Sequence, residues 1–70
     1  MTPVALTSSV LYAADYDGVT RKLTLVMKSG KRYIYAEVPV AEYQNLLLAK
    51  SSGTYYNQHI KGKYTVIEHS

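Results

Sequence analysis

Residues 28–35 read Lys-Ser-Gly-Lys-Arg-Tyr-Ile-Tyr, a basic turn that leads directly into a segment with two tyrosines separated by one residue. The apolar run 23–27 precedes this turn, which indicates a β-hairpin. Side chains alternate between the two faces of a strand, so Tyr33 and Tyr35 share a face while Ile34 points the other way. The packing of these two rings therefore depends on the register of the hairpin.

The length of the hairpin loop decides which face the two tyrosines occupy. A loop of two residues places them opposite the face of Leu23 and Leu25, whereas a loop of three residues, 28–30, places them on the leucine face. We favour three residues, because a glycine at the last loop position readily adopts the left-handed conformation of a common three-residue hairpin. Gly30 occupies that position.

A further strand is expected upstream of the hairpin. Residues 10–17 alternate, with Val10 on the side that also carries Tyr12, and residues 17–21 read as a turn in which Gly18 takes a positive φ. Residues 1–8 show no convincing period and are expected to form a flexible N-terminal arm, leaving 9–70 as a single domain. One face of the predicted sheet then collects Tyr12, Ala14, Tyr16, Leu23, Leu25, Met27, Tyr33 and Tyr35.

Two helices are expected to cover this apolar face. Pro39 suits the first turn of a helix, whose inward stripe would consist of Val40, Tyr43, Leu46 and Leu47. Gly53 is a candidate left-handed terminator of that helix, and Thr54 a candidate N-cap of a short second helix that runs through Ile60 and ends at Gly62.

The expected fold is therefore α+β, a three-stranded antiparallel meander covered by one main helix and a short second helix. Residues 64–68 have the composition of a short C-terminal strand, and an extended tail remains the alternative for them.

Composition argues against an enzyme. A chain of 70 residues buries a small core and has few residues to spare for a catalytic cavity. His59 has no second ligand at a suitable offset, and His69 lies in the terminal tail. Asp15 and Asp17 lie near a turn, so we expect no metal, no cofactor and no catalytic residue. The absence of cysteine and of a long apolar segment is consistent with a cytoplasmic protein that has no membrane association.

Positive charge is concentrated in the middle of the chain. The net charge is +3, and residues 21–35 contain five lysine or arginine residues and no acid. Such a cluster suits contacts with nucleic-acid phosphates, but two exposed hairpin turns would give the same pattern. All eight aromatic residues are tyrosines, which suit both a core and a binding face because the ring is apolar and the hydroxyl polar.

The order of landmarks along the chain resembles that of the KTSC domain, a family named for the C-terminus of certain lysyl-tRNA synthetases and found also as small bacterial proteins. The resemblance covers about residues 8–64 and includes a central Tyr-x-Tyr motif at Tyr33 and Tyr35. It implies RNA binding, suggested by the synthetase context. The landmarks are Tyr16-Asp17, Leu23 to Met27, Ser29-Gly30, Tyr33-Ile34-Tyr35, Val38-Pro39, Tyr43, Leu46-Leu47, Ala49, Gly53 to Asn57, and Ile60 to Tyr64.

Two hypotheses about function follow from these patterns. The first is a non-catalytic module that binds RNA or another single-stranded nucleic acid, in which aromatic rings stack on bases and cations contact the backbone. Our own register favours the alternative for the tyrosine pair, in which both rings lie beneath the helix. The candidate contacts are Arg21, Lys22, Lys31, Arg32, Tyr33, Tyr35, Tyr56, Asn57, Lys61 and Lys63.

The second hypothesis is a protein-interaction or homodimerisation module without a nucleic-acid role. The second sheet face carries Val26, Ile34 and Ala13, and no predicted element covers it. An apolar face of this kind is typical of a dimer interface, and a small chain without cross-links would gain stability from pairing.

Overall fold

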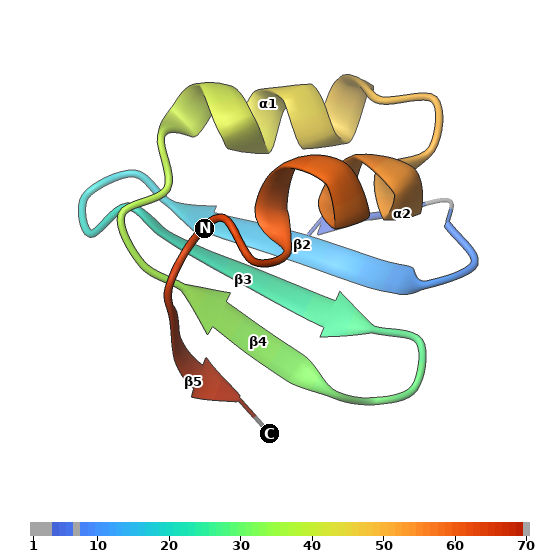
Figure 1. Ribbon diagram of the computed structural model, residues 1–70, viewed down its shortest axis with the longest axis horizontal. Coiled ribbons are helices and arrows are strands. Elements are labelled where there is room, and N and C mark those ends of the chain that lie inside the picture. Colours follow the sequence, from blue (N-terminus) through green and yellow to red (C-terminus); the bar gives the residue numbers. More distant parts are fainter. Residues whose placement is uncertain (1–3, 7, 70) are drawn as a thin grey trace.

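A computed structural model describes residues 4–6 and 8–69, and in it an antiparallel sheet carries helices on one of its faces (Figure 1). The sheet has five strands, whose spatial order is the order of the chain. The strands are β1 (Val4–Ala5), β2 (Leu11–Asp17), β3 (Lys22–Met27), β4 (Arg32–Tyr35) and β5 (Val66–His69). The helical segments are α1 (Val40–Leu48), α2 (Ser52–Tyr55) and η1 (Tyr56–Ile60), the last of which is a turn of π-helix.

The fold class is α+β, as expected, and the possible C-terminal strand is present as β5, but the sheet has five strands where a three-stranded meander was predicted. Val4, which lies in the segment expected to be an arm, pairs with Ala14 in β2. At the other edge of the sheet, β5 pairs with β4. Both edge strands are short and consist of exposed residues; the composition of β5 indicated a strand, whereas the two residues of β1 are too few to show an alternation. The flexibility of the arm stays a prediction, and residues 1–3 and 7 lie outside the described residues.

The register of the central hairpin is the predicted one. Leu25 lies opposite Tyr33, and the Met27 backbone N–H donates to the Lys31 carbonyl at 2.7 Å, which leaves residues 28–30 as the loop. Gly30 has a φ of 94° and so takes the left-handed position that the three-residue loop requires. Tyr33 and Tyr35 consequently face the helices.

Strand β2 departs from simple alternation. The register shifts between Leu11 and Ala13, so two residues of β2 face one of β3, as in a β-bulge. The bulge turns Leu11 into the core, where it is fully buried, and leaves Tyr12 61% exposed and Val10 41% exposed. The expectation that Tyr12 and Val10 would lie inward was therefore wrong, whereas Ala14, beyond the bulge, is buried as expected.

The turn between β2 and β3 also differs from expectation. The Asp17 carboxylate accepts hydrogen bonds from the backbone N–H groups of Val19 and Thr20, and the Arg21 N–H donates to the Asp17 carbonyl at 2.7 Å. This bond spans the predicted turn, residues 17–21, but the left-handed residue is Arg21, with a φ of 60°. Gly18 does not have a positive φ.

Helix α1 packs across the sheet through Tyr43 and Leu46, both buried. Pro39 is its N-cap and has an extended ψ of 147°, so the helix begins one residue later than a proline in the first turn would place it. Val40 is 52% exposed and does not belong to the inward stripe, contrary to expectation. Ala49 already has an extended conformation, so the helix ends before Gly53 without a glycine terminator.

The second helical segment begins at a different cap from the one expected. The Ser51 hydroxyl accepts a hydrogen bond from the Thr54 backbone N–H at 3.2 Å, so Ser51 is the N-cap and Thr54 lies inside the helix. Gly53 is buried here, and a Cβ at this position would lie 2.9 Å from the Ser8 Oγ and 3.6 Å from the Val10 Cβ. Its role is to allow close approach of the helix to the chain before β2.

Candidate nucleic-acid interface

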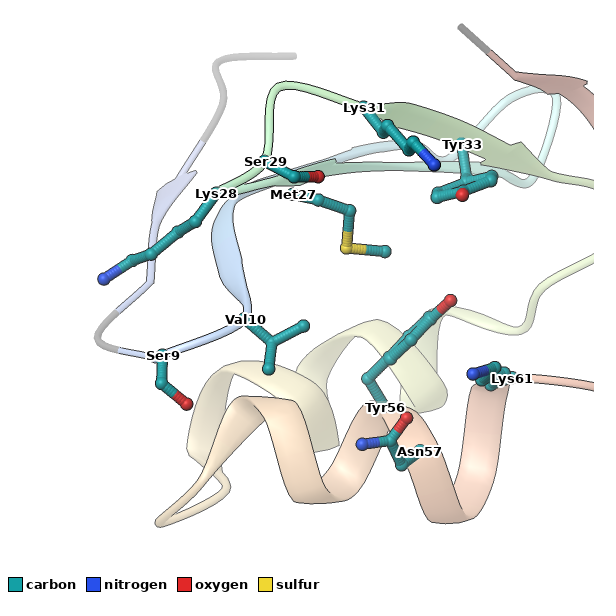
Figure 2. Close-up of a pocket in the computed structure, with 10 residues that line it drawn as sticks. All are labelled: Ser9, Val10, Met27, Lys28, Ser29, Lys31, Tyr33, Tyr56, Asn57 and Lys61. Atoms are coloured by element: carbon teal, nitrogen blue, oxygen red, sulfur yellow. The ribbon is translucent and has the colours of Figure 1, made fainter.

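A pocket opens where the β3–β4 turn faces η1, and its volume is about 380 Å³ (Figure 2). Side chains from the sheet and from the helical layer line it together. They are Ser9, Val10, Met27, Lys28, Ser29, Lys31, Tyr33, Tyr56, Asn57 and Lys61. Three lysines and no acidic residue belong to this lining, so the charged side chains of the pocket are all positive.

The hairpin supplies the sheet side of the pocket. Lys31 and Tyr33 are two residues apart and therefore project on the same face, toward the helical layer (Figure 2). Met27 lies across from Lys31 and extends from the sheet into the pocket. Tyr33 is only half-buried, so part of its ring faces the open space.

The π-turn supplies the opposite side. The Lys61 backbone N–H donates to the Tyr56 carbonyl at 2.8 Å, a spacing of five residues instead of the four of an α-helix. This wider turn brings Lys61 back to the side of the helix that carries Tyr56 and Asn57, as Figure 2 shows. Gly62, with a φ of 77°, then turns the chain away toward β5.

Two tyrosines connect the pocket to the core. The hydroxyl groups of Tyr35 and Tyr56 lie 2.8 Å apart and form a hydrogen bond, and the two rings meet edge to face with centroids 6.3 Å apart. Burial, with a smaller contribution from this hydrogen bond, raises the pKa of Tyr35 above its ordinary value. The pair holds η1 against β4 and fixes the position of the Tyr56 ring at the pocket.

A second polar cluster, none of whose residues lines the pocket, connects segments of the helical layer. Both Glu42 carboxylate oxygens accept hydrogen bonds, from the Tyr55 hydroxyl at 2.5 Å and from the Tyr64 hydroxyl at 2.8 Å. The Tyr55 ring stacks on His59 with centroids 4.4 Å apart. Glu42 thus connects α1 with α2 and with the segment that follows η1.

Both histidines are exposed, and each lies beside a tyrosine ring. His59 stacks on Tyr55, and His69 lies opposite Tyr33 in the pairing of β5 with β4. In the part of the chain that the structure describes, no group of three or more potential ligands could hold a metal ion. Over the same residues, no helix is long and apolar enough to cross a membrane.

Comparison with known proteins identifies the family. The model of the KTSC domain matches residues 7–64. The chain belongs to the KTSC domain family. A crystal structure of a KTSC domain protein from Yersinia pestis superimposes with a TM-score of 0.89 at 29% identity, covering 93% of this chain and 92% of that one.

Relatives of this KTSC domain occur both as small proteins and within a larger enzyme. A protein from Tsukamurella paurometabola is 36% identical over 67 residues, which are 96% of this chain and 97% of the relative. A lysine–tRNA ligase from Nostoc punctiforme is 38% identical over 56 residues, which are 80% of this chain but only 10% of the ligase. The similarity to the ligase thus concerns one small segment of it.

The structure of the KTSC domain separates the two tyrosines of the Tyr-x-Tyr motif. Tyr35 is 2% exposed and belongs to the core, whereas Tyr33 lies at the edge of the pocket. The alternative in which both rings lie beneath the helices therefore holds for Tyr35. Tyr33 retains a surface on which a ligand can stack.

The predicted contacts divide into two groups. The pocket brings together five of them, Lys31, Tyr33, Tyr56, Asn57 and Lys61. Of these, Tyr56 is 6% exposed, so its contribution is limited to the part that reaches the pocket.

The other predicted contacts lie elsewhere. Arg21 and Lys22 are at the far end of β3, a strand of 6 residues that is roughly 20 Å long at about 3.3 Å per residue. Arg32 pairs with Val26 on the sheet face away from the helices. Lys63 is exposed after η1 and does not line the pocket. A single basic face that includes all five cations of 21–35 therefore does not form.

Sequence reasoning did not assign five of the lining residues, which are Ser9, Val10, Met27, Lys28 and Ser29. Lys28 and Ser29 could have been assigned to the pocket from their position in the loop, because the predicted register places this turn at the end of the sheet next to Lys31. Ser9 and Val10 carried no such signal, since the bulge at Leu11 determines where they point.

Proposed function

We propose that this KTSC domain is a non-catalytic cytoplasmic module that binds RNA or another single-stranded nucleic acid, with the pocket of Figure 2 at the centre of the interface. The observation that supports this function is the presence of Lys31 and Lys61 in one pocket with the half-buried ring of Tyr33. Lysines contact phosphates, and stacking of a base on an aromatic ring contributes about 1–3 kcal/mol. The similarity to one small segment of a lysine–tRNA ligase, an enzyme that acts on an RNA, is consistent with this proposal.

The salt dependence of binding tests the proposal. We expect a fluorescently labelled single-stranded RNA to bind at low salt, with an affinity that falls as salt increases. For single strands, each phosphate contact contributes about −0.7 to the slope of log K against log salt. The double variant Lys31→Gln/Lys61→Gln should therefore reduce the magnitude of the slope by about 1.4.

A matched control removes the same charge at the other end of the sheet. Arg21→Gln/Lys22→Gln lowers the net charge equally but lies away from the pocket, so its slope should stay close to that of the unmodified protein. If no complex forms at low salt, or if the affinity does not respond to salt, the proposal is wrong. Equal slopes for the two double variants would place the interface elsewhere.

A second candidate function is self-association through the uncovered sheet face. The helices lie on the other side of the sheet (Figure 1), and Val26 and Ile34 are partly exposed on neighbouring strands. The occupant that suits this face is a second copy of the chain, since pairing would cover both residues. Light scattering over a range of concentrations tests this function: a dimer that Ile34→Lys dissociates supports it, and a monomer throughout contradicts it.

A further inference from the structure

The hydroxyl pair of Tyr35 and Tyr56 has two protons but only one hydrogen bond between its members. Each hydroxyl can donate once, and one of the two must donate to the other across 2.8 Å. Among the described residues, the structure shows no further side-chain or backbone partner for either hydroxyl. One O–H group of the pair therefore still needs an acceptor.

The surroundings of the two residues indicate which of the two O–H groups is left without an acceptor inside the protein. Tyr35 belongs to the core and is 2% exposed, so a proton left on its oxygen would face a buried environment without an acceptor, which is unfavourable. Tyr56 lines the pocket, where an acceptor from outside can reach it. This difference favours Tyr35 as the donor to Tyr56, which leaves the Tyr56 O–H group to donate into the pocket.

The interior of the pocket suits a flat, partly apolar group better than a bare anion. Val10 and Met27 extend into it, and the rings of Tyr33 and Tyr56 bound it (Figure 2). A phosphate placed among these groups would lose its hydration without gaining enough hydrogen bonds or ion pairs to replace it. A base has apolar faces and acceptor atoms at its edge, so it suits these groups better. The volume of about 380 Å³ is within the range of small-ligand sites.

The charged groups lie where a backbone would pass. Lys31 extends from β4 beside Tyr33, and Lys61 extends from the end of η1 beside Asn57, on the opposite side of the pocket (Figure 2). Lys28 points away from both in the same view. A nucleotide with its base inward would thus have a lysine available for phosphate on either side.

We propose that the pocket takes one unstacked base of a single-stranded nucleic acid, with an acceptor atom of the base receiving the Tyr56 hydroxyl and the flanking phosphates contacting Lys31 and Lys61. This inference rests on the proposed function and adds to it the part of the ligand that enters the pocket. Tyr33 is the ring on which the base stacks, and Asn57 is placed to contact the base edge.

A matched pair of variants tests the inference. Tyr35→Phe and Tyr56→Phe each remove the same internal hydrogen bond and keep both rings, but Tyr56→Phe also leaves the buried Tyr35 O–H group without an acceptor, so it should lower the thermal stability more. Only Tyr56→Phe removes the donor to the ligand. In RNA titrations at low salt, we expect Tyr56→Phe to weaken binding about five-fold, the typical value of one neutral hydrogen bond, and Tyr35→Phe by less than about two-fold.

A measurement on the unmodified protein avoids dependence on variants that fail to fold. Met27 extends into the pocket, so its methyl resonance in an NMR spectrum should shift when the RNA is added. The same titration is repeated with inorganic phosphate as the probe. We expect RNA to shift the Met27 methyl signal and phosphate to leave it unchanged.

The possible outcomes separate this inference from the proposed function. If RNA binds but the Met27 signal does not move, or if the two tyrosine variants lose affinity equally, the base does not enter the pocket although the domain binds RNA. If inorganic phosphate shifts Met27 as RNA does, a phosphate occupies the pocket and the assignment of the base is wrong. If no RNA binds at all, both the proposed function and this inference are wrong.

Discussion

Two tyrosine hydroxyls, those of Tyr55 and Tyr64, donate to the same carboxylate, that of Glu42. These two hydrogen bonds connect segments of the helical layer, so the protonation of single side chains affects its stability. Burial, followed by the hydrogen bond to Glu42, raises the pKa of Tyr64 to about 12. The same two causes, in the same order, raise the pKa of Tyr55. The protonated hydroxyl is the donor in each bond, so both bonds require these tyrosines to remain neutral.

The pKa of Tyr64 predicts a loss of stability at alkaline pH. A tyrosine in the unfolded chain titrates near pH 10, and Tyr64 in the folded protein titrates near pH 12. Its contribution to stability is therefore complete below about pH 10 and is lost as the pH rises toward about 12. Denaturant unfolding measured between these values should show a falling free energy of unfolding.

Variants that remove a single tyrosine hydroxyl test whether Tyr64 causes this loss of stability at alkaline pH. Tyr64→Phe should make the decline with pH shallower, and part of the decline should remain because the pKa of Tyr35 is also raised, mainly by burial. Tyr12→Phe, which removes a hydroxyl from a side chain that is 61% exposed, is the matched control. An unchanged decline in Tyr64→Phe would show that the Glu42 bond does not couple protonation to folding.

At the scale of elements, the β3–β4 hairpin positions both the core and the pocket. Its three-residue loop places Tyr35 in the core and Lys31 at the pocket, and a slip of one residue would exchange the two faces of β4. Gly30, with a φ of 94°, is the residue that permits this loop. The loop itself contributes Lys28 and Ser29 to the pocket lining.

Substitution of Gly30 should therefore destabilise the protein although the space around it is open. No heavy atom lies within 4 Å of a Cβ built at Gly30, so the cost comes from the backbone angle alone. For an L-residue in the left-handed region it is about 1–2 kcal/mol. Gly30→Ala should lower the free energy of unfolding by this amount in a denaturant titration.

Gly18→Ala is the matched control for that prediction. Gly18 also lies in a hairpin turn with open space around it, but its φ is not positive. Alanine there should leave stability unchanged or raise it by about 0.4–1 kcal/mol, because it restricts the unfolded chain. Equal effects of the two substitutions would mean that the positive φ of Gly30 does not determine the hairpin.

At the scale of the molecule, the helices cover one face of the sheet, and the last strand adds little to the core. All residues of β5 are exposed, and the pocket includes none of them. The strand nevertheless pairs with β4 at Tyr33, Ile34 and Tyr35. Its main effect is therefore to cover the edge of β4, which would otherwise be open to pairing with another chain.

Ending the chain at Thr65 removes β5 and tests this role. We expect a folded protein, because the buried core includes no residue of β5. Three cross-strand pairs would be lost, which corresponds to about 1–3 kcal/mol of stability at the typical value per pair. Circular dichroism melts measure the loss, and light scattering should detect increased association through the exposed edge of β4. An unfolded chain would contradict this account.

Much of the fold follows from local patterns that the sequence displays directly. The alternation of Leu23 and Leu25, the position of Gly30, and the spacing of Tyr43 and Leu46 predict the hairpin, its register and the face that α1 covers. These features depend on neighbours within a few residues, so each segment carries its own signal. Predictions that relied on one residue type failed where another residue supplied the same geometry, as with Arg21 in place of Gly18 and Ser51 in place of Thr54.

The sequence by itself thus determined the α+β class, the hairpin and the tyrosines as the residues that contact both core and solvent. Only the tertiary structure decided that a bulge exposes Tyr12, that β1 adds to the sheet, and that Lys61 lies across a pocket from Lys31 while Arg21 and Arg32 lie elsewhere. The physical reason is that these features arise between segments distant in the chain, where pairing and packing select one arrangement among several that local preference allows.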